Sequence, residues 1–95
     1  MTQPTYEEFE ADARARGFDE VLVREWTPDL VIATHTHSFA VDALVVRGQV
    51  ALSAGGATAH LQAGDRFQLE REAPHAETYG PEGATFWVAR RNVAP

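Results

Sequence analysis

Turn-forming residues punctuate most of the chain, and their regular spacing limits the fold more than any other feature. Between the turns, short segments alternate in the way that strands do, so that Val21 and Val23 would face opposite to Leu22. Gly55-Gly56 is typical of a hairpin. Short strands with turns roughly every 8–12 residues predict an all-β chain, folded as an antiparallel jelly-roll sandwich or barrel.

The spacing divides the region after residue 19 into about eight expected strands. Their ranges are 21–26, 30–37, 43–46, 50–53, 57–61, 67–69, 76–79 and 85–89. Glycines and a proline in 80–83 predict a turn between the last two strands. A chain of 95 residues is short enough for one domain, so we expect a single barrel domain over residues 20–95.

Residues 1–19 are expected to form a helical segment ahead of the barrel. Thr5 and Glu8 have the spacing of a capping box, and Gly17 stands where a helix commonly ends. These features predict a short N-terminal α-helix from Thr5 to Arg16. Its apolar stripe, which would dock on a sheet or on a partner chain, consists of Tyr6, Phe9 and Ala13.

Composition excludes several classes of function. The net charge of −6 argues against nucleic-acid binding, which needs a basic face to offset the phosphates. Cysteine is absent, so disulfides, thiolate chemistry and cysteine-based zinc sites are excluded. The N-terminus lacks the apolar stretch of a signal peptide, and no apolar run is long enough to span a membrane. We therefore expect a cytoplasmic protein with no nucleic-acid or membrane partner.

Histidines indicate a chemical site. His35 and His37 are two residues apart on an expected strand, so their imidazoles would point to the same face. Two such imidazoles can bind one metal ion at about 2.0–2.1 Å, and His75 from another strand would complete a set of three. His60 alternates with the core-facing Leu61 and is expected at the surface.

The two histidine motifs resemble those of the cupin superfamily, over roughly residues 20 to 91. The first motif is similar to the stretch from His35-Thr36-His37 to Gly48, and the second to the stretch from Gly64-Asp65 to Pro74-His75. The resemblance implies a small jelly-roll barrel that carries one divalent metal ion. The three histidines of these motifs would be its ligands.

The usual metal-binding glutamate of the first motif is missing, and two other carboxylates compete for its place. Asp42 follows the histidine pair closely, but the count back from Gly48 reaches Val41 instead. Because strand register is rigid, we expect Asp42 to face away from the interior and to be exposed. Glu77 shares the face of His75, so we expect it to be the fourth ligand or to orient a histidine.

Two aromatic residues are expected at the pocket. Phe39 shares the face of His37 and would line the pocket wall. Tyr79 continues the face of Glu77 and would hydrogen-bond a ligand at the mouth. The basic pair Arg90-Arg91 is expected to be a solvated end of the chain rather than an anion clamp.

Three imidazoles and one carboxylate leave positions open on a divalent ion, as Lewis-acid or O₂ chemistry requires. The resemblance implies a metal-dependent enzyme of dioxygenase, isomerase or lyase type, acting on a small oxygenated molecule. The alternative is a non-catalytic module that binds or senses a small molecule, and a third is a barrel whose metal is only structural. The ligand types suit Zn, Ni, Fe, Mn or Cu and do not choose among them.

We also expect a homodimer. The chain is short, and its first 26 residues carry more apolar surface than a lone barrel of this size would cover. Aromatic anchors are enriched in protein interfaces. The residues expected at the interface are Tyr6, Phe9, Leu22 and Trp26.

Overall fold

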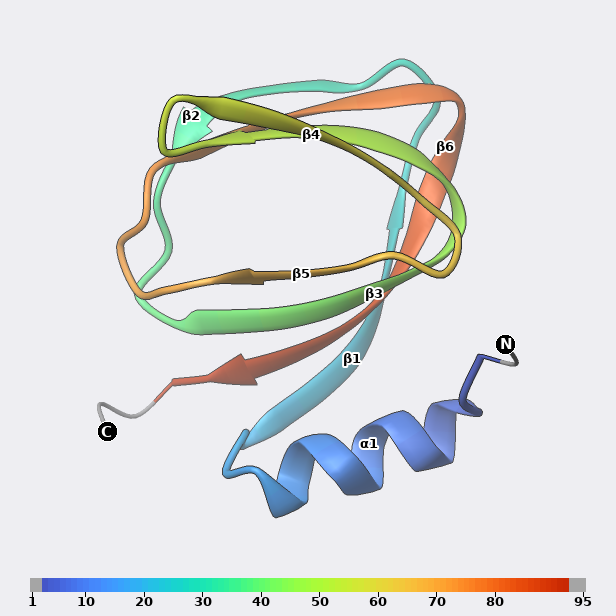
Figure 1. The fold of residues 1–95 in the computed structure, drawn as a ribbon, viewed down its shortest axis with the longest axis vertical. Helices are drawn as coiled ribbons and strands as arrows, with labels where there is room; N and C mark the ends of the chain where they lie inside the picture. Colours follow the sequence, from blue (N-terminus) through green and yellow to red (C-terminus); the bar gives the residue numbers. More distant parts are fainter. Residues whose placement is uncertain (1–2, 93–95) are drawn as a thin grey trace.

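The computed structural model describes residues 3–92, in which one helix lies outside a barrel of six antiparallel strands (Figure 1). The elements in chain order are α1 (Tyr6–Ala15), β1 (Glu20–Trp26), β2 (Val31–His35), β3 (Ala40–Ala54), β4 (Ala57–Gln62), β5 (Arg66–Leu69) and β6 (His75–Arg91). This architecture is the all-β jelly roll that the turn spacing predicted, with the short N-terminal helix that the capping box predicted.

Two strands are much longer than predicted, because pairs of expected short strands are continuous. The expected strands 43–46 and 50–53 both lie in β3, and 76–79 and 85–89 both lie in β6. The segment 80–83, predicted as a turn, is a bulge within β6, where the register with β3 shifts. The expected eight strands therefore become six.

The long strands come into close contact at Gly48 and Gly83. Both glycines have positive φ, 80° and 69°. A Cβ on Gly48 would lie 2.0 Å from the carbonyl oxygen of Gly83, and one on Gly83 would lie 2.2 Å from that of Trp26. Glycine is therefore required at both positions, on conformational and on steric grounds.

The register shifts divide β3 and β6 into halves that belong to two layers. One layer contains β1 and β5 beside the C-terminal half of β6 and the N-terminal half of β3. The other contains β2 and β4 beside the remaining halves. Segments far apart in sequence therefore surround one interior.

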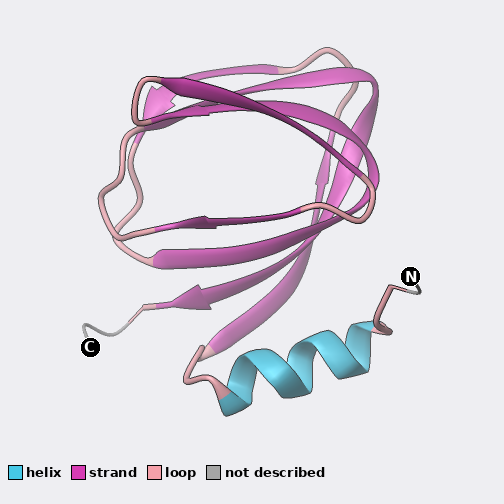
Figure 2. Ribbon diagram, viewed as in Figure 1, coloured by secondary structure: helices cyan, strands magenta, loops and turns pink. Residues whose placement is uncertain are grey.

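The layer that contains β1 is covered on both faces (Figure 2). Its inner face contributes to the barrel core, which contains Ala43, Val45, Val50, Tyr79, Ala84, Phe86 and Val88. Its outer face carries α1 and a second core of Phe9, Ala13, Leu44 and Ala89. The Thr5 hydroxyl and the Glu8 carboxylate form the predicted capping box, which fixes the start of α1.

The residues expected at a dimer interface pack inside their own chain. Phe9 is 2% exposed, and it packs with Tyr6 against the ring of Trp87. Leu22 and Trp26 pack against the barrel core from β1. Phe9 is thus buried within its own chain, whereas the other three residues stay partly exposed, so the interface assignment stays a prediction. The homodimer itself stays a prediction.

Among residues 3–92, no helix has the length and the apolar character that a membrane crossing requires.

Candidate metal centre

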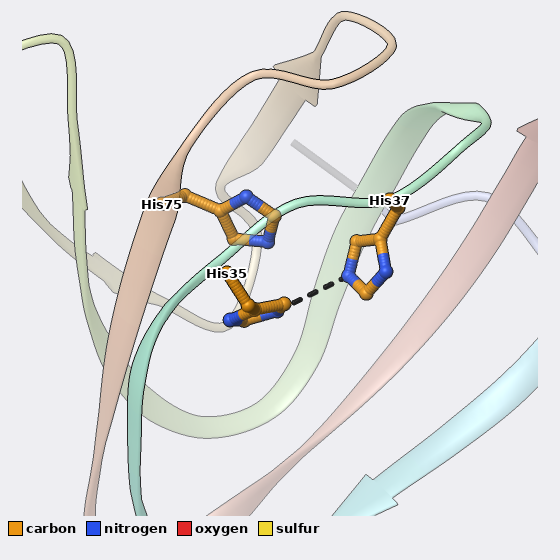
Figure 3. Close-up of side chains that lie close together, drawn as sticks. All are labelled: His35, His37 and His75. Atoms are coloured by element: carbon orange, nitrogen blue, oxygen red, sulfur yellow. Dashed lines mark hydrogen bonds between the residues drawn. The ribbon is translucent and has the colours of Figure 1, made fainter.

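The three motif histidines come together inside the barrel, at the end where β2 and β6 pair (Figure 3). His35, the last residue of β2, is the register partner of His75, the first residue of β6. His37 was expected on the same strand as His35, but it lies in the loop after β2. The backbone N–H of Glu72 donates to the His37 carbonyl oxygen at 2.8 Å and ties that loop to the one before β6.

Backbone carbonyls orient two of the imidazoles. Nδ1 of His35 lies 2.9 Å from the carbonyl oxygen of Ala33, and Nδ1 of His75 lies 2.9 Å from that of Ala73. A carbonyl oxygen can only accept, so Nδ1 carries the proton in both rings. In the neutral imidazole, Nε2 then presents its lone pair, which is the form that binds a metal.

The spacing of the ring nitrogens fits a single metal ion. The Nε2 atoms of His35 and His37 are 3.2 Å apart, and one ligand nitrogen from each of the three rings lies within 4.8 Å of the others. Adjacent nitrogens that each lie about 2.1 Å from one ion are roughly 3.0–3.4 Å apart. Burial, and then the neighbouring His35 and His75, lower the pKa of His37, which favours its neutral form.

Glu77 faces the same cluster from β6. Its Oε2 lies 3.5 Å from Nε2 of His35 and 3.7 Å from Nε2 of His75. Its Oε1 accepts a 2.5 Å hydrogen bond from the Tyr79 hydroxyl. Burial, and then this hydrogen bond, raise the pKa of Tyr79, so the hydroxyl stays protonated and donates. The three histidines could therefore hold a metal, with Glu77 as a fourth ligand or as an orienting group.

The sequence suggested that Tyr79 lies at the mouth of the pocket, but the structure places it in the core. It is 2% exposed and stacks on Trp26, with ring centroids 5.1 Å apart. The physical reason is the length of β6, which carries alternate residues from the site down into the core. Its polar contact is therefore with Glu77 and not with solvent.

Asp42 lies on the other face of β3, under α1. It faces away from the interior, but it is 2% exposed rather than solvated. Its Oδ2 accepts hydrogen bonds from Arg16 at 2.8 Å and from Gln68 at 3.3 Å, and Arg66 lies 3.6 Å from Oδ1. The expected exposure was wrong because the sequence did not show that the end of α1 would cover this position. His60 is exposed on β4, away from the cluster.

The histidine cluster opens into a cavity of about 90 Å³ between the strands. Its lining residues are Arg24, Trp26, His35, His37, Phe39, Val41, Phe67, Leu69, His75, Glu77, Phe86, Val88 and Arg90. Phe39 lies in the wall, and its ring stacks on that of His37 at 4.8 Å and 11°.

Sequence reasoning missed two arginines of this cavity. Arg90 was expected in a solvated end of the chain, but its side chain is 19% exposed and lines the cavity. Arg24 was not considered. Strand parity was the available signal, since Arg24 alternates with the outward Val23 and shares the inner face with Leu22 and Trp26.

The sequence matches one protein family. The pattern of that family, described as the AraC-like ligand binding domain, matches residues 18–90. No curated protein matches the chain at a significant level.

Several solved structures resemble the barrel. A structure of the DMSP lyases RdDddP and RnDddQII is 28% identical, with a TM-score of 0.68 over 75% of this chain and 37% of that chain. An uncharacterized conserved protein with a double-stranded beta-helix domain from Klebsiella pneumoniae is 27% identical, with a TM-score of 0.64 over 76% of this chain and 65% of that one. An RmlC-like cupin from Shewanella frigidimarina shares the fold at 21% identity, with a TM-score of 0.65 over 78% of this chain and 68% of that one. The chain thus spans less than two thirds of the length of the first two of these proteins.

Proposed function

The chain belongs to the family of AraC-like ligand-binding domains, which have the cupin fold, and we propose that it binds a small molecule at a divalent metal ion inside its barrel. The observation that carries this proposal is the position of the histidine cluster. Its imidazoles meet at one side of a cavity that is otherwise mostly apolar, which is the usual character of a small-molecule site.

The residues that would hold the metal are His35, His37 and His75, with Glu77 beside them. Imidazole and carboxylate suit Zn, Ni, Fe, Mn or Cu. When bound, such an ion supplies a Lewis acid with positions open to a ligand. The two Nδ1 contacts to backbone carbonyls support the proposal, because they fix ring orientation before any metal arrives.

The other residues of the chain would shape the site. The apolar side chains of β3, β5 and β6 would contact the body of a ligand in the cavity, and the Phe39 ring holds the plane of the His37 ring by stacking. Tyr79 holds one oxygen of Glu77, which leaves the other directed at the histidines. In this arrangement the ligand would enter a site whose polar groups are already oriented.

A second function is a metal-dependent enzyme, and the likeness to a lyase structure at 28% identity favours it. In the described cavity, Glu77 with Tyr79 is the group best placed to accept or return a proton beside the histidines. A binding or sensing module would keep its ligand unchanged, whereas an enzyme of lyase type would convert it.

The proposal is tested by metal analysis of the purified protein, alone and after loading with each candidate metal. We expect one ion per chain in the parent protein and none in the folded variant with His35, His37 and His75 replaced by alanine. Equal metal content in the two proteins would reject the site. A screen for turnover with the metal present then separates the enzyme from the binding module.

A further inference from the structure

The cavity contains two cationic side chains that the proposed metal site does not use. Arg24 comes from the inner face of β1, and Arg90 comes from the C-terminal end of β6. In the antiparallel register, Arg24 pairs with Phe86, so the two arginines stand four positions apart along β6. They therefore lie at different positions along the strand direction, in the same wall of the cavity.

Arg90 lies next to the histidine cluster. Its guanidinium lies 4.5 Å from the centroid of the Phe39 ring, on which His37 also stacks. Within residues 3–92, its one carboxylate contact is a 3.5 Å approach to Glu20, a half-exposed side chain. Its Nε is buried and has no hydrogen-bond partner among the described residues. A buried donor of this kind is costly unless an acceptor reaches it.

Unlike Arg90, Arg24 has no anionic partner in the part of the chain that the structure describes, since no carboxylate lies within 4.0 Å of it. Its guanidinium lies 4.5 Å from the centroid of the Trp26 ring. Stacking of this kind fixes the plane of the guanidinium and leaves its N–H groups available at the edge.

The charges of the cavity are unbalanced. Glu77 is the one carboxylate among its lining residues, which also include two arginines and the three imidazoles. A bound divalent ion would increase the positive charge. The chain as a whole is acidic, with a net charge of −6, so this excess is local. The remaining walls are apolar, mainly Val41, Phe67, Leu69, Phe86 and Val88.

From these observations we infer that the ligand is a small organic carboxylate. Its charged end is bound by Arg90, its short carbon body lies against the apolar walls, and Arg24 adds positive charge farther along the same cavity. A planar carboxylate accepts two parallel hydrogen bonds from one edge of a guanidinium, which would satisfy the buried Nε of Arg90. The inference rests on the proposed function in placing the ligand in this cavity.

The test compares carboxylates with neutral molecules of the same shape. Propionate, butyrate and valerate are titrated into the full chain by isothermal calorimetry, beside propionamide, butyramide and valeramide. We expect at least one acid to bind and to do so more than about 10-fold more tightly than its amide, since hydrogen bonds to charged groups are the strong ones. Equal binding of acids and amides, or no binding of any acid, would overturn the inference. Tighter binding of butyl phosphate than of valerate would overturn the choice of a carboxylate.

Variants locate the interaction. Arg90→Gln should weaken acid binding by roughly 10-fold or more, Arg24→Gln should weaken it less, and neither should change amide binding. Arg71→Gln is the matched control, because Arg71 is exposed in a turn outside the cavity. Unchanged acid binding in both cavity variants would contradict the inference.

The same samples are titrated with each candidate metal, so that the two proposals fail separately. If none of these metals binds but acids bind through Arg90, the metal proposal fails and the present inference stands. If a metal binds but acids bind no better than amides, the metal proposal stands and the present inference fails.

Discussion

The Tyr79 hydroxyl donates a 2.5 Å hydrogen bond to one oxygen of Glu77, while the other oxygen of that carboxylate faces His35 and His75. Tyr79, Glu77 and His75 are alternate residues of β6, so one strand carries one histidine of the cluster, the carboxylate and the group that orients the carboxylate. The geometry makes Glu77 the connection between the core and the proposed metal site.

Replacing Tyr79 by phenylalanine should weaken metal binding by roughly 10-fold, the lower end of the effect of groups that orient metal ligands. The ring, and its stacking on Trp26, are retained, so the change is confined to one hydrogen bond. Zinc titration of the variant gives the dissociation constant. Tyr6→Phe, on α1, is the control, and an unchanged constant for Tyr79→Phe would refute the orienting role.

Replacing Glu77 by glutamine should weaken metal binding by about 10- to 100-fold. The amide keeps an oxygen that can accept from Tyr79 but removes the negative charge near the imidazoles. Competition with a chelator measures the affinity. If the variant binds metal as tightly as the parent, Glu77 is a structural carboxylate and no part of the site.

Replacing Asp42 by asparagine should leave metal binding unchanged and lower the free energy of unfolding by about 1–3 kcal/mol. The substitution removes the charge that the Arg16 and Gln68 side chains contact under α1. Urea unfolding measures the loss. Asp12→Asn is the control, since Asp12 forms an exposed pair within α1 and should cost much less. Equal losses in the two variants would contradict a buried role for Asp42.

Replacing Gly48 by alanine should destabilise the barrel far more than the same change at Gly55. Both glycines have positive φ, which alone costs alanine about 1–3 kcal/mol. A Cβ at Gly48 would also clash with the backbone of Gly83, whereas one at Gly55 meets nothing within 4 Å. Thermal or urea unfolding of the two variants shows the difference. Similar stabilities would mean that the two strands can separate at this point without cost.

Metal should stabilise the folded chain. At a free zinc concentration about 100 times the dissociation constant, binding adds roughly 2.7 kcal/mol to the free energy of unfolding. The thermal midpoint of the parent should therefore rise with zinc and fall on chelation. His75→Ala should respond little, while His60→Ala, at an exposed position, should respond as the parent does. A zinc response that survives in His75→Ala would point to a different site.

Local patterns determined several features of this protein. Alternation separated the two faces of β1 without showing which one is inner, the spacing of Thr5 and Glu8 predicted the start of α1, and turn spacing predicted an antiparallel jelly roll. Each of these features depends on residues close together in the chain. The two-residue repeat of a strand or the three-residue spacing of a capping box is therefore enough to predict it. The histidine spacing belongs to this group as well, because it suggested which side chains to bring together.

Long-range pairing decided the rest. The bulge at 80–83 merged the expected strands, the end of α1 covered Asp42, and the register of β1 against β6 placed Arg24 and Arg90 in the cavity. Glu20 and Arg90 are register partners although they are 70 residues apart in the chain. No local pattern specifies such a partner, because strand pairing is set by the packing of the whole barrel. The sequence thus indicated the histidines, whereas only the tertiary structure showed that two arginines line the same cavity.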